Sequence, residues 1–351
     1  MPAVPTVGVV IANHNNSDFV GKAIESVARQ TVRDILAVVV DDASTDRSDE
    51  TIRRCLSQLD DARFRYIKLD SNLGQAGAIR RGLAELKTPF VCFLDSDDFW
   101  YDEFVARQIV THLNADFPVA LTYCDSHIVD ADERLLAGTA WWFDADADSG
   151  PAARRAIDPA LLPAIDPRTG KLTYPANPGI TFRPGWSPAD ATNTTASMML
   201  RRSFVDLVLV PPNHDLRLYV DFYLSTFAGL LTGVIAIHEA LYAYRMHGGN
   251  KHSNATVLGG RYNSSTRPWE TVRANTLRLI RGVLESKAEA FRTAFGEGRH
   301  DEAMALVAGA IGEPPSEPAK PSRGRVLGTL LGRADRSSGN GHDPAHRPRS
   351  R

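Results

Sequence analysis

The sequence is poor in cysteine and has no long apolar run, and each absence narrows the class of protein. Its three cysteines, Cys55, Cys92 and Cys124, have the spacing of neither a zinc site nor a disulfide framework, so we expect reduced thiols. No window approaches the roughly 18 consecutive apolar residues of a membrane-spanning helix. The first residues also lack the basic start and apolar core of a signal peptide. We therefore expect a cytoplasmic protein, with peripheral membrane contact left open.

The chain also lacks a strong charge of one sign and a phosphate-binding glycine fingerprint. Lys and Arg number 40 against 42 Asp and Glu, a formal net charge of −2, so no general positive field for nucleic acid is expected. No glycine-rich turn follows the first apolar run, Val7 to Ala12, which argues against a dinucleotide-binding or P-loop protein. At 351 residues the chain is long enough to bury a substantial core.

Apolar runs of strand length alternate with helical patterns through the first third of the chain. This alternation predicts an α/β fold with a mostly parallel, Rossmann-like sheet, right-handed crossovers and flanking helices. The later helical patterns predict a helical C-terminal region. The expected strands are at 7–12, 35–40, 64–69, 90–94, 119–123 and 234–237, and the expected helices at 17–30, 48–59, 78–86, 99–112, 269–295 and 301–311.

Polar or acidic side chains follow the first, second and fourth of these strands. Asn13 follows the first, Asp41 and Asp42 end the second, and Asp95 to Asp98 end the fourth. Three carboxylates within four residues repel one another, and a divalent cation at this point would balance them. Because ligands of open parallel sheets bind at the carboxyl ends of the strands, we expect these loops to converge on one site. The alternative for the last loop is a turn that caps a helix.

Three further segments carry open alternatives. Prolines and aromatic residues crowd residues 138–190, which predicts a long insertion, a lid or a binding loop. Its tryptophans Trp141, Trp142 and Trp186 could stack on a ligand or only anchor the loop. The pair Arg201-Arg202 could face an anionic ligand or solvent. From residue 313 onward the composition predicts disorder.

Several motifs, in this order, resemble those of the family 2 glycosyltransferases. The specific part of the resemblance covers about residues 5–100, and two weaker matches follow it. These later matches resemble the acceptor-side acid motif and the terminal Arg-x-His segment of that family. The motifs are Val-Val-Ile-Ala-Asn-His-Asn at 9–15, Val-Asp-Asp-Ala-Ser-Thr-Asp at 40–46, Asn72-x-Gly74 with Ala78 and Gly82, Phe-Leu-Asp-Ser-Asp-Asp at 93–98, Val-Asp-Phe-Tyr-Leu at 220–224 and Tyr-Arg-Met-His-Gly-Gly-Asn at 244–250.

The resemblance implies a GT-A fold and an enzyme that moves a sugar from a nucleotide-diphospho-sugar to a hydroxyl acceptor, with inversion. Mn2+ or Mg2+ is the implied cofactor, and a UDP-sugar is the favoured donor. A glycan, a lipid-linked glycan or a protein stays open as acceptor. The implied domains are 1–250 for the GT-A domain, with 1–115 as its nucleotide-binding half and 116–250 as its acceptor half, then 251–312 as a helical extension and 313–351 as a tail.

The resemblance also implies roles for single residues. Asp97 would bind the metal, His247 would complete the metal or diphosphate site, and Asp221 would be the general base. Asp41 or Asp42 would contact the base of the nucleotide, and Asp95 the ribose or sugar. The full set implied for nucleotide-sugar binding is Ala12, Asn13, Asn15, Asp41, Asp42, Asn72, Arg80, Asp95 and Ser96.

The sequence departs from the family pattern at three places. Ala43 stands where glycine is usual, and Arg80 with Arg81 where asparagine is common, so Arg80 is expected to neutralise the diphosphate instead. Val220-Asp221 replaces the usual Glu-Asp pair, which leaves Asp215 as a rival base. A nucleotidyltransferase, or a catalytically silent module that binds nucleotide-sugar, remains as the alternative function.

Overall fold

The computed structural model describes residues 6–138, 164–165, 167–168, 172–173, 179–187, 194–210, 216, 219–250 and 269–312. Contacts divide the chain into two units, Met1–Pro315 and Ser316–Arg351, and all described residues lie in the first. The predictions for Trp141, Trp142 and Asp215, for most of the insertion and for the tail therefore lie outside the described residues.

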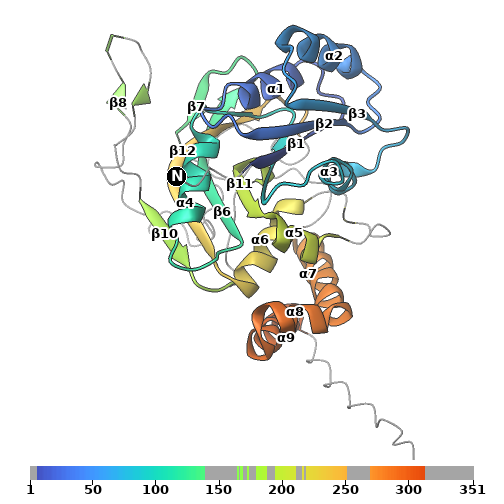
Figure 1. Ribbon diagram of the computed structural model, residues 1–351, viewed down its shortest axis with the longest axis vertical. Helices are drawn as coiled ribbons and strands as arrows, with labels where there is room; N and C mark the ends of the chain where they lie inside the picture. Colours follow the sequence, from blue (N-terminus) through green and yellow to red (C-terminus); the bar gives the residue numbers. More distant parts are fainter. Residues whose placement is uncertain are drawn as a thin grey trace, which may run out of the picture. The chain divides into compact units, whose positions relative to one another are not determined.

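A ten-stranded sheet forms the centre of the described part, in the order β10-β12-β6-β11-β4-β1-β2-β3, with β5 and β7 beside β12 and β6 (Figure 1). Strands β3, β2, β1 and β4 are parallel, as predicted, whereas β11 is antiparallel to β4. A separate hairpin pairs β8 with β9. The strands are β1 Val7–Asn13, β2 Ile35–Asp41, β3 Phe64–Lys68, β4 Phe90–Asp95, β5 Phe99–Trp100, β6 Leu121–Asp130, β7 Leu135–Ala137, β8 Ala164–Ile165, β9 Leu172–Thr173, β10 Ile180–Arg183, β11 Met198–Arg201 and β12 Val234–Met246.

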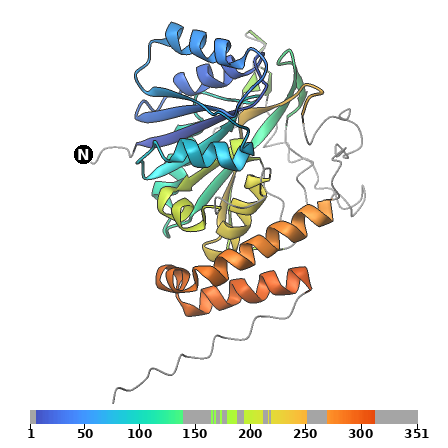
Figure 2. The same ribbon diagram turned by 90° about the vertical axis from the view of Figure 1, so that its right-hand side faces the viewer.

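Helices cover both faces of the sheet, which explains why β1 is apolar without interruption. Val10 packs in one buried cluster with residues of α3, whereas Val9 and Ile11 pack in another with residues of α1 and α2. Figures 1 and 2 show α1 and α2 on the side of the first strands opposite α3. The helices are α1 Val20–Ala28, α2 Ser48–Leu59, α3 Gly74–Leu83, α4 Phe104–Asn114, the 3-10 turn η5 Thr195–Ser197, α5 Arg202–Val208, α6 Val220–Leu231, α7 Trp269–Ser286, α8 Ala288–Phe295 and α9 Glu297–Ile311.

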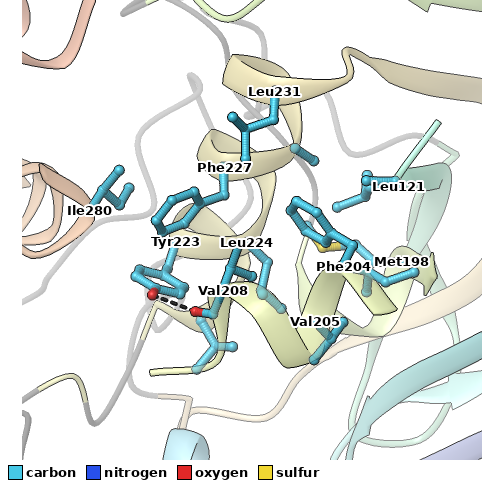
Figure 3. Close-up of a cluster of buried hydrophobic side chains, with 14 of the residues drawn as sticks. Leu121, Met198, Phe204, Val205, Val208, Tyr223, Leu224, Phe227, Leu231 and Ile280 are labelled. Atoms are coloured by element: carbon cyan, nitrogen blue, oxygen red, sulfur yellow. Dashed lines mark hydrogen bonds between the residues drawn. The ribbon is translucent and has the colours of Figure 1, made fainter. Parts of the chain in front are cut away.

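Helix α6 joins the C-terminal helices to the core of the sheet (Figure 3). Its residues Tyr223, Leu224 and Phe227 are buried with residues of the sheet and of α7 to α9 in one cluster. The Phe227 ring stacks on Phe291 of α8 with centroids 5.9 Å apart, and the Tyr223 hydroxyl donates to the Val208 carbonyl at 2.6 Å. The first residues of α6 are therefore held on a packed support.

Each predicted element is present, but several bounds differ: the strand expected at 119–123 runs over 121–130, and the helices expected at 78–86 and 301–311 run over 74–83 and 297–311. Three further predictions are corrected. The helix expected from residue 99 begins at Phe104, because Phe99 and Trp100 form β5 against Ala243 and Tyr242. The strand expected at 234–237 continues to residue 246 through register shifts near its polar residues 238 and 239. The helix expected over 269–295 is two helices, α7 and α8, which are separated at Lys287.

Replacing Gly82 with alanine is expected to destabilise the fold. A Cβ at Gly82 would lie 2.5 Å from Cγ1 of Val10 and 3.2 Å from Cγ2 of Val40, so α3 would have to move away from β1 and β2. We expect Gly82→Ala to lower the free energy of unfolding by about 1–3 kcal/mol in a denaturant titration. Gly21→Ala on α1 is the control: its Cβ would meet only Cγ2 of Thr51, at 3.9 Å, so no loss is expected. Equal stability of the two variants would contradict the close packing of α3.

Candidate functional site

The loops after β1 and β2 form one hydrogen-bonded unit at the edge of the sheet. In the parallel register Asn13 lies beside Asp41, and Ala12 lies beside Asp95 of β4. The Asn13 amide donates to Oδ1 of Asp41 at 3.0 Å and to Oγ of Ser44 at 3.1 Å. The backbone N–H of Asn15 also donates to Oγ of Ser44, at 2.9 Å. The expected convergence of these loops is confirmed.

Two residues of this unit have left-handed backbone. Asn15 has φ of 58°, and its side-chain oxygen accepts from the backbone N–H of Thr45 at 2.7 Å, which ties the first motif to the second. Ala43 has φ of 55°. Glycine, the usual family residue at this position, adopts such a left-handed conformation at little cost in free energy. For alanine the same conformation costs about 1–2 kcal/mol.

Asp42 connects the second motif to the third. Its Oδ1 accepts from the backbone N–H of Leu73 at 2.7 Å, and its Oδ2 from that of Gly74 at 2.8 Å. The Asn72 side-chain oxygen also accepts from the Gly74 N–H, at 3.1 Å. Asp41 is fully buried, and its Oδ2 has no hydrogen-bond partner in the described part of the chain. Both carboxylates thus fix loop geometry as well as offering acceptor oxygens.

Asp95, at the end of β4, is held by two side chains that sequence reasoning missed. Gln75 Nε2 donates to Oδ1 of Asp95 at 2.7 Å, and Thr195 Oγ1 donates to Oδ2 at 2.9 Å. Burial, and then the carboxylate of Asp97, raises the pKa of Asp95 to about 7, although both hydrogen bonds oppose the shift. The position of Gln75 within the third motif was the only sequence signal for this contact.

The acidic loop after β4 meets the end of β12. Asp97 Oδ2 lies 3.3 Å from Nε2 of His247, and both side chains are mostly buried. Asp98 points elsewhere, because its Oδ1 accepts from the backbone N–H of Arg245 at 2.9 Å. Ser96 is buried, and its hydroxyl accepts from the Asn16 amide at 2.9 Å. In this loop Asp98 therefore makes a structural contact with the backbone, whereas Asp97 forms a side-chain pair with His247.

Asp221 lies in the first turn of α6, two residues after Tyr219, whose φ is 63°. Its Oδ1 accepts from the N–H of Phe222 at 2.8 Å. Burial raises the pKa of Asp221 to about 6. Its charge also contributes, less than burial and Asp97 do, to the raised pKa of Asp95.

Other candidates lie away from this region. Arg201 pairs with Phe90 at the opposite end of β4, and its Nε donates to the Val119 carbonyl at 2.9 Å. The backbone N–H of Arg202 donates to the Pro89 carbonyl at 2.9 Å, so both arginines lie at the end of β4 opposite the acidic loop, which favours the alternative that they do not face the anionic ligand. Trp186 is buried against α6 at Gly229, which favours an anchoring role. Arg80 lies half-buried on α3, and its role stays a prediction.

Comparison with known proteins identifies the family of one part of the chain. Residues 8–155 match the profile of Glycosyl transferase family 2. This part, less than half of the chain, is a family 2 glycosyltransferase domain. The match covers the first four strands, the acidic loop and β6 of this glycosyltransferase, and thus contains most of the site just described.

Relatives of this glycosyltransferase include an uncharacterized glycosyltransferase of Nostoc, 26% identical over 250 residues, which are 71% of this chain and 67% of the relative. A UDP-Glc:alpha-D-GlcNAc-diphosphoundecaprenol beta-1,3-glucosyltransferase of Escherichia coli is 32% identical over 35% of this chain and 46% of that protein. The succinoglycan biosynthesis protein ExoO of Rhizobium meliloti is 33% identical over 38% of this chain and 36% of that protein. The alignments thus span less than half of the last two relatives.

The solved structure of Staphylococcus aureus TarS residues 1–349 in complex with UDP-GlcNAc resembles this glycosyltransferase with a TM-score of 0.51 and 14% identity, over 87% of this chain and 81% of that one. The predicted GT-A fold is confirmed, as is the helical C-terminal region. No helix within the described ranges is long and apolar enough to cross a bilayer. The domain boundaries and the residue roles stay predictions.

Among the described residues, one pair of side chains could hold a divalent cation. No group of three His, Cys, Asp or Glu side chains converges in the described part of the chain, but Asp97 and His247 form a pair with 3.3 Å between Oδ2 and Nε2. Adjacent ligands at about 2.1 Å from an octahedral ion are about 3.0 Å apart, close to this separation. A carboxylate and an imidazole suit Mn2+, with phosphate oxygens and water as the remaining ligands.

Proposed function

We propose that the chain transfers a sugar from a nucleotide-diphospho-sugar to a hydroxyl acceptor, with inversion, in the synthesis of a surface polysaccharide or another glycan. The observation that carries the proposal is the meeting of Asp97 and His247, 150 residues apart in the chain, beside the loop after β1, whose Phe19 ring lies 4.5 Å from the His247 ring. The two relatives named for a beta-1,3-glucosyltransferase and for succinoglycan biosynthesis support the class of product.

The first two loops suit the nucleotide. Backbone and amide groups would be presented to it by Ala12, Asn13 and Asn15. The carboxylate of Asp41 or Asp42 would accept a hydrogen bond from the ring N–H of a base such as uracil. Asp95, at the next strand end, would accept from the ribose or sugar hydroxyls, with Ser96 and Asn72 beside these contacts. Arg80 remains the candidate cation for the diphosphate. The TarS complex with UDP-GlcNAc supports a UDP-sugar as donor, although only the fold is shared at this identity.

Asp97 and His247 would hold Mn2+ or Mg2+. When bound, such a cation neutralises the charge that grows on the departing diphosphate. Asp221 is the proposed base: its carboxylate takes the proton of the acceptor hydroxyl while the acceptor oxygen bonds to the anomeric carbon. The bond from that carbon to the diphosphate oxygen breaks, and the diphosphate leaves with the electron pair. Attack opposite the leaving group inverts the anomeric centre.

The pH dependence of turnover is expected to report Asp221. Burial raises its pKa to about 6, and only the deprotonated carboxylate accepts a proton. At saturating donor and acceptor, kcat should therefore fall about tenfold per pH unit below about 6 and stay level above it, if the bound substrates leave the pKa in place. A kcat that remains constant down to pH 4.5 would contradict Asp221 as the base.

A thermal-shift panel of nucleoside diphosphates and their sugars, with and without Mn2+, tests the proposal when it is combined with product analysis. We expect a UDP-sugar to stabilise the protein, more so with Mn2+, and a hydroxyl acceptor to yield a new glycosidic product. A nucleotidyltransferase would instead release pyrophosphate from a nucleoside triphosphate and a sugar phosphate. A silent module would bind the donor and neither transfer nor hydrolyse it.

A further inference from the structure

Arg245 is a buried cation next to the proposed metal pair. Only 2% of its side chain is exposed, and it lies near the end of β12, two residues before His247. A guanidinium is always charged at physiological pH, and its burial is costly unless it is paired and hydrogen-bonded. The contacts of Arg245 should therefore show what it stabilises.

Two of these contacts hold the acidic loop. Arg245 Nε donates to the backbone carbonyl of Asp97 at 2.8 Å, and the backbone N–H of Arg245 donates to Oδ1 of Asp98 at 2.9 Å. The loop is thus gripped at two successive residues. The backbone of Asp97, whose carboxylate lies 3.3 Å from His247, is therefore held in place.

Other contacts hold His247 itself. The Phe19 ring lies between the two residues, with its centroid 4.9 Å from the Arg245 guanidinium carbon and 4.5 Å from the His247 ring. The Asn250 amide donates to the Arg245 carbonyl at 2.7 Å, and its oxygen accepts from the His247 N–H at 2.8 Å. Movement of Arg245 would therefore disturb both members of the pair.

Glu133 anchors the outer end of Arg245. Its Oε1 accepts from Nη2 of Arg245 at 3.4 Å, and its Oε2 accepts from Nζ of Lys22 at 2.8 Å. Glu133 has φ of 65°, a left-handed backbone that costs a residue with a Cβ about 1–2 kcal/mol. Glycine would be less strained at this position. The advantage of glutamate is therefore its side-chain contacts with Arg245 and Lys22.

We propose that Arg245, anchored by Glu133, is a positioning residue that sets the separation of Asp97 and His247 for cation binding. The proposal rests on the metal-dependent function proposed above. It predicts that these two residues tune metal-dependent nucleotide affinity without touching substrate, since outer partners of metal ligands typically change affinity 10- to 100-fold.

The test is calorimetric titration of the full chain with UDP, with and without Mn2+. We expect Arg245→Met to weaken Mn2+-dependent UDP affinity at least tenfold and UDP affinity without metal less than twofold. Arg245→Lys keeps the charge but not the planar fork, so an intermediate loss is expected. Arg63→Met is the matched control, because Arg63 also donates to a backbone carbonyl, that of Ala28 at 3.1 Å, away from the site. It should lose stability without losing metal-dependent affinity.

Glu133→Gly separates positioning from folding and decides the test if Arg245→Met does not fold. It relieves the left-handed strain, which offsets part of the cost of leaving Arg245 and Lys22 without their carboxylate partner, so the melting temperature should change little, while Mn2+-dependent UDP affinity falls at least fivefold. If Glu133 had only a structural role, its replacement would not lower Mn2+-dependent UDP affinity while leaving the melting temperature nearly unchanged. Metal-dependent affinity within twofold of wild type in Arg245→Met, or in Glu133→Gly where Arg245→Met is unfolded, would overturn the positioning role alone. Absence of Mn2+-dependent binding of any nucleoside diphosphate to wild type would overturn the proposed function and this role together.

Discussion

Asp221→Asn is expected to abolish sugar transfer and to leave donor binding in place. The substitution keeps the shape of the side chain and its acceptor oxygen for the Phe222 N–H, but it removes the group that takes the acceptor proton. General-base catalysis contributes about 10²- to 10⁴-fold, so kcat should fall by that factor. The dissociation constant of the donor should stay within twofold. Initial rates at saturating substrates, paired with calorimetry, provide both numbers.

The same variant should gain stability at pH 8. The pKa of Asp221 is raised from 3.8 to about 6 in the fold, so its ionised form costs folding free energy above pH 6, and the cost disappears below about pH 4. Asparagine avoids this cost, and we expect a gain of about 1–3 kcal/mol in the free energy of unfolding. Asp206→Asn is the control, because Asp206 is half exposed and pairs with Arg202 at the surface. Transfer near the wild-type rate in Asp221→Asn would move the role of base to the rival, Asp215.

Asp97→Ala is expected to remove metal-dependent donor binding. Loss of an outer partner of a metal ligand typically costs 10- to 100-fold in affinity, so loss of the ligand itself should cost at least about 100-fold. His247→Ala should weaken the same binding, since its Nε2 is 3.3 Å from Oδ2 of Asp97. Titration of UDP at several Mn2+ concentrations measures both effects.

The exposed Asp102, which pairs with Arg29, supplies the control Asp102→Ala. This variant should bind UDP and Mn2+ like the wild type. If Asp97→Ala kept its dependence on Mn2+, Asp97 would not be a metal ligand, and the pair with His247 would have only a structural role.

Much of the fold could be predicted because local patterns and global topology agree in the first third of the chain. The runs at β1, β2 and β4 are apolar throughout, as strands buried on both faces must be, and each ends in polar residues. Parallel pairing then leaves only one edge for those residues to share. For this reason the neighbours Asn13, Asp41 and Asp95 follow from sequence and topology.

The missed contacts depend on residues far apart in the chain. The sequence around Phe99 and Trp100 is typical of the start of a helix. In the structure these two residues pair with β12 instead, which follows them by more than 140 residues. Thr195 and Gln75 are 120 residues apart, and no motif connects them, so apart from the position of Gln75 within the third motif nothing in the sequence indicates their joint contact with Asp95. The anchoring of Arg245 by Glu133 similarly depends on the turn between β6 and β7. Glu133 has a left-handed backbone in this turn, and because it is neither glycine nor asparagine, the sequence gives no sign of that conformation.

The most direct measurement is a crystal structure with UDP and Mn2+, with data collected at the manganese absorption edge. The account predicts one anomalous peak in contact with both Oδ2 of Asp97 and Nε2 of His247, with the diphosphate on the same ion and the base against the loops of β1 and β2. An ion bound elsewhere, or a nucleotide that avoids these loops, would contradict it.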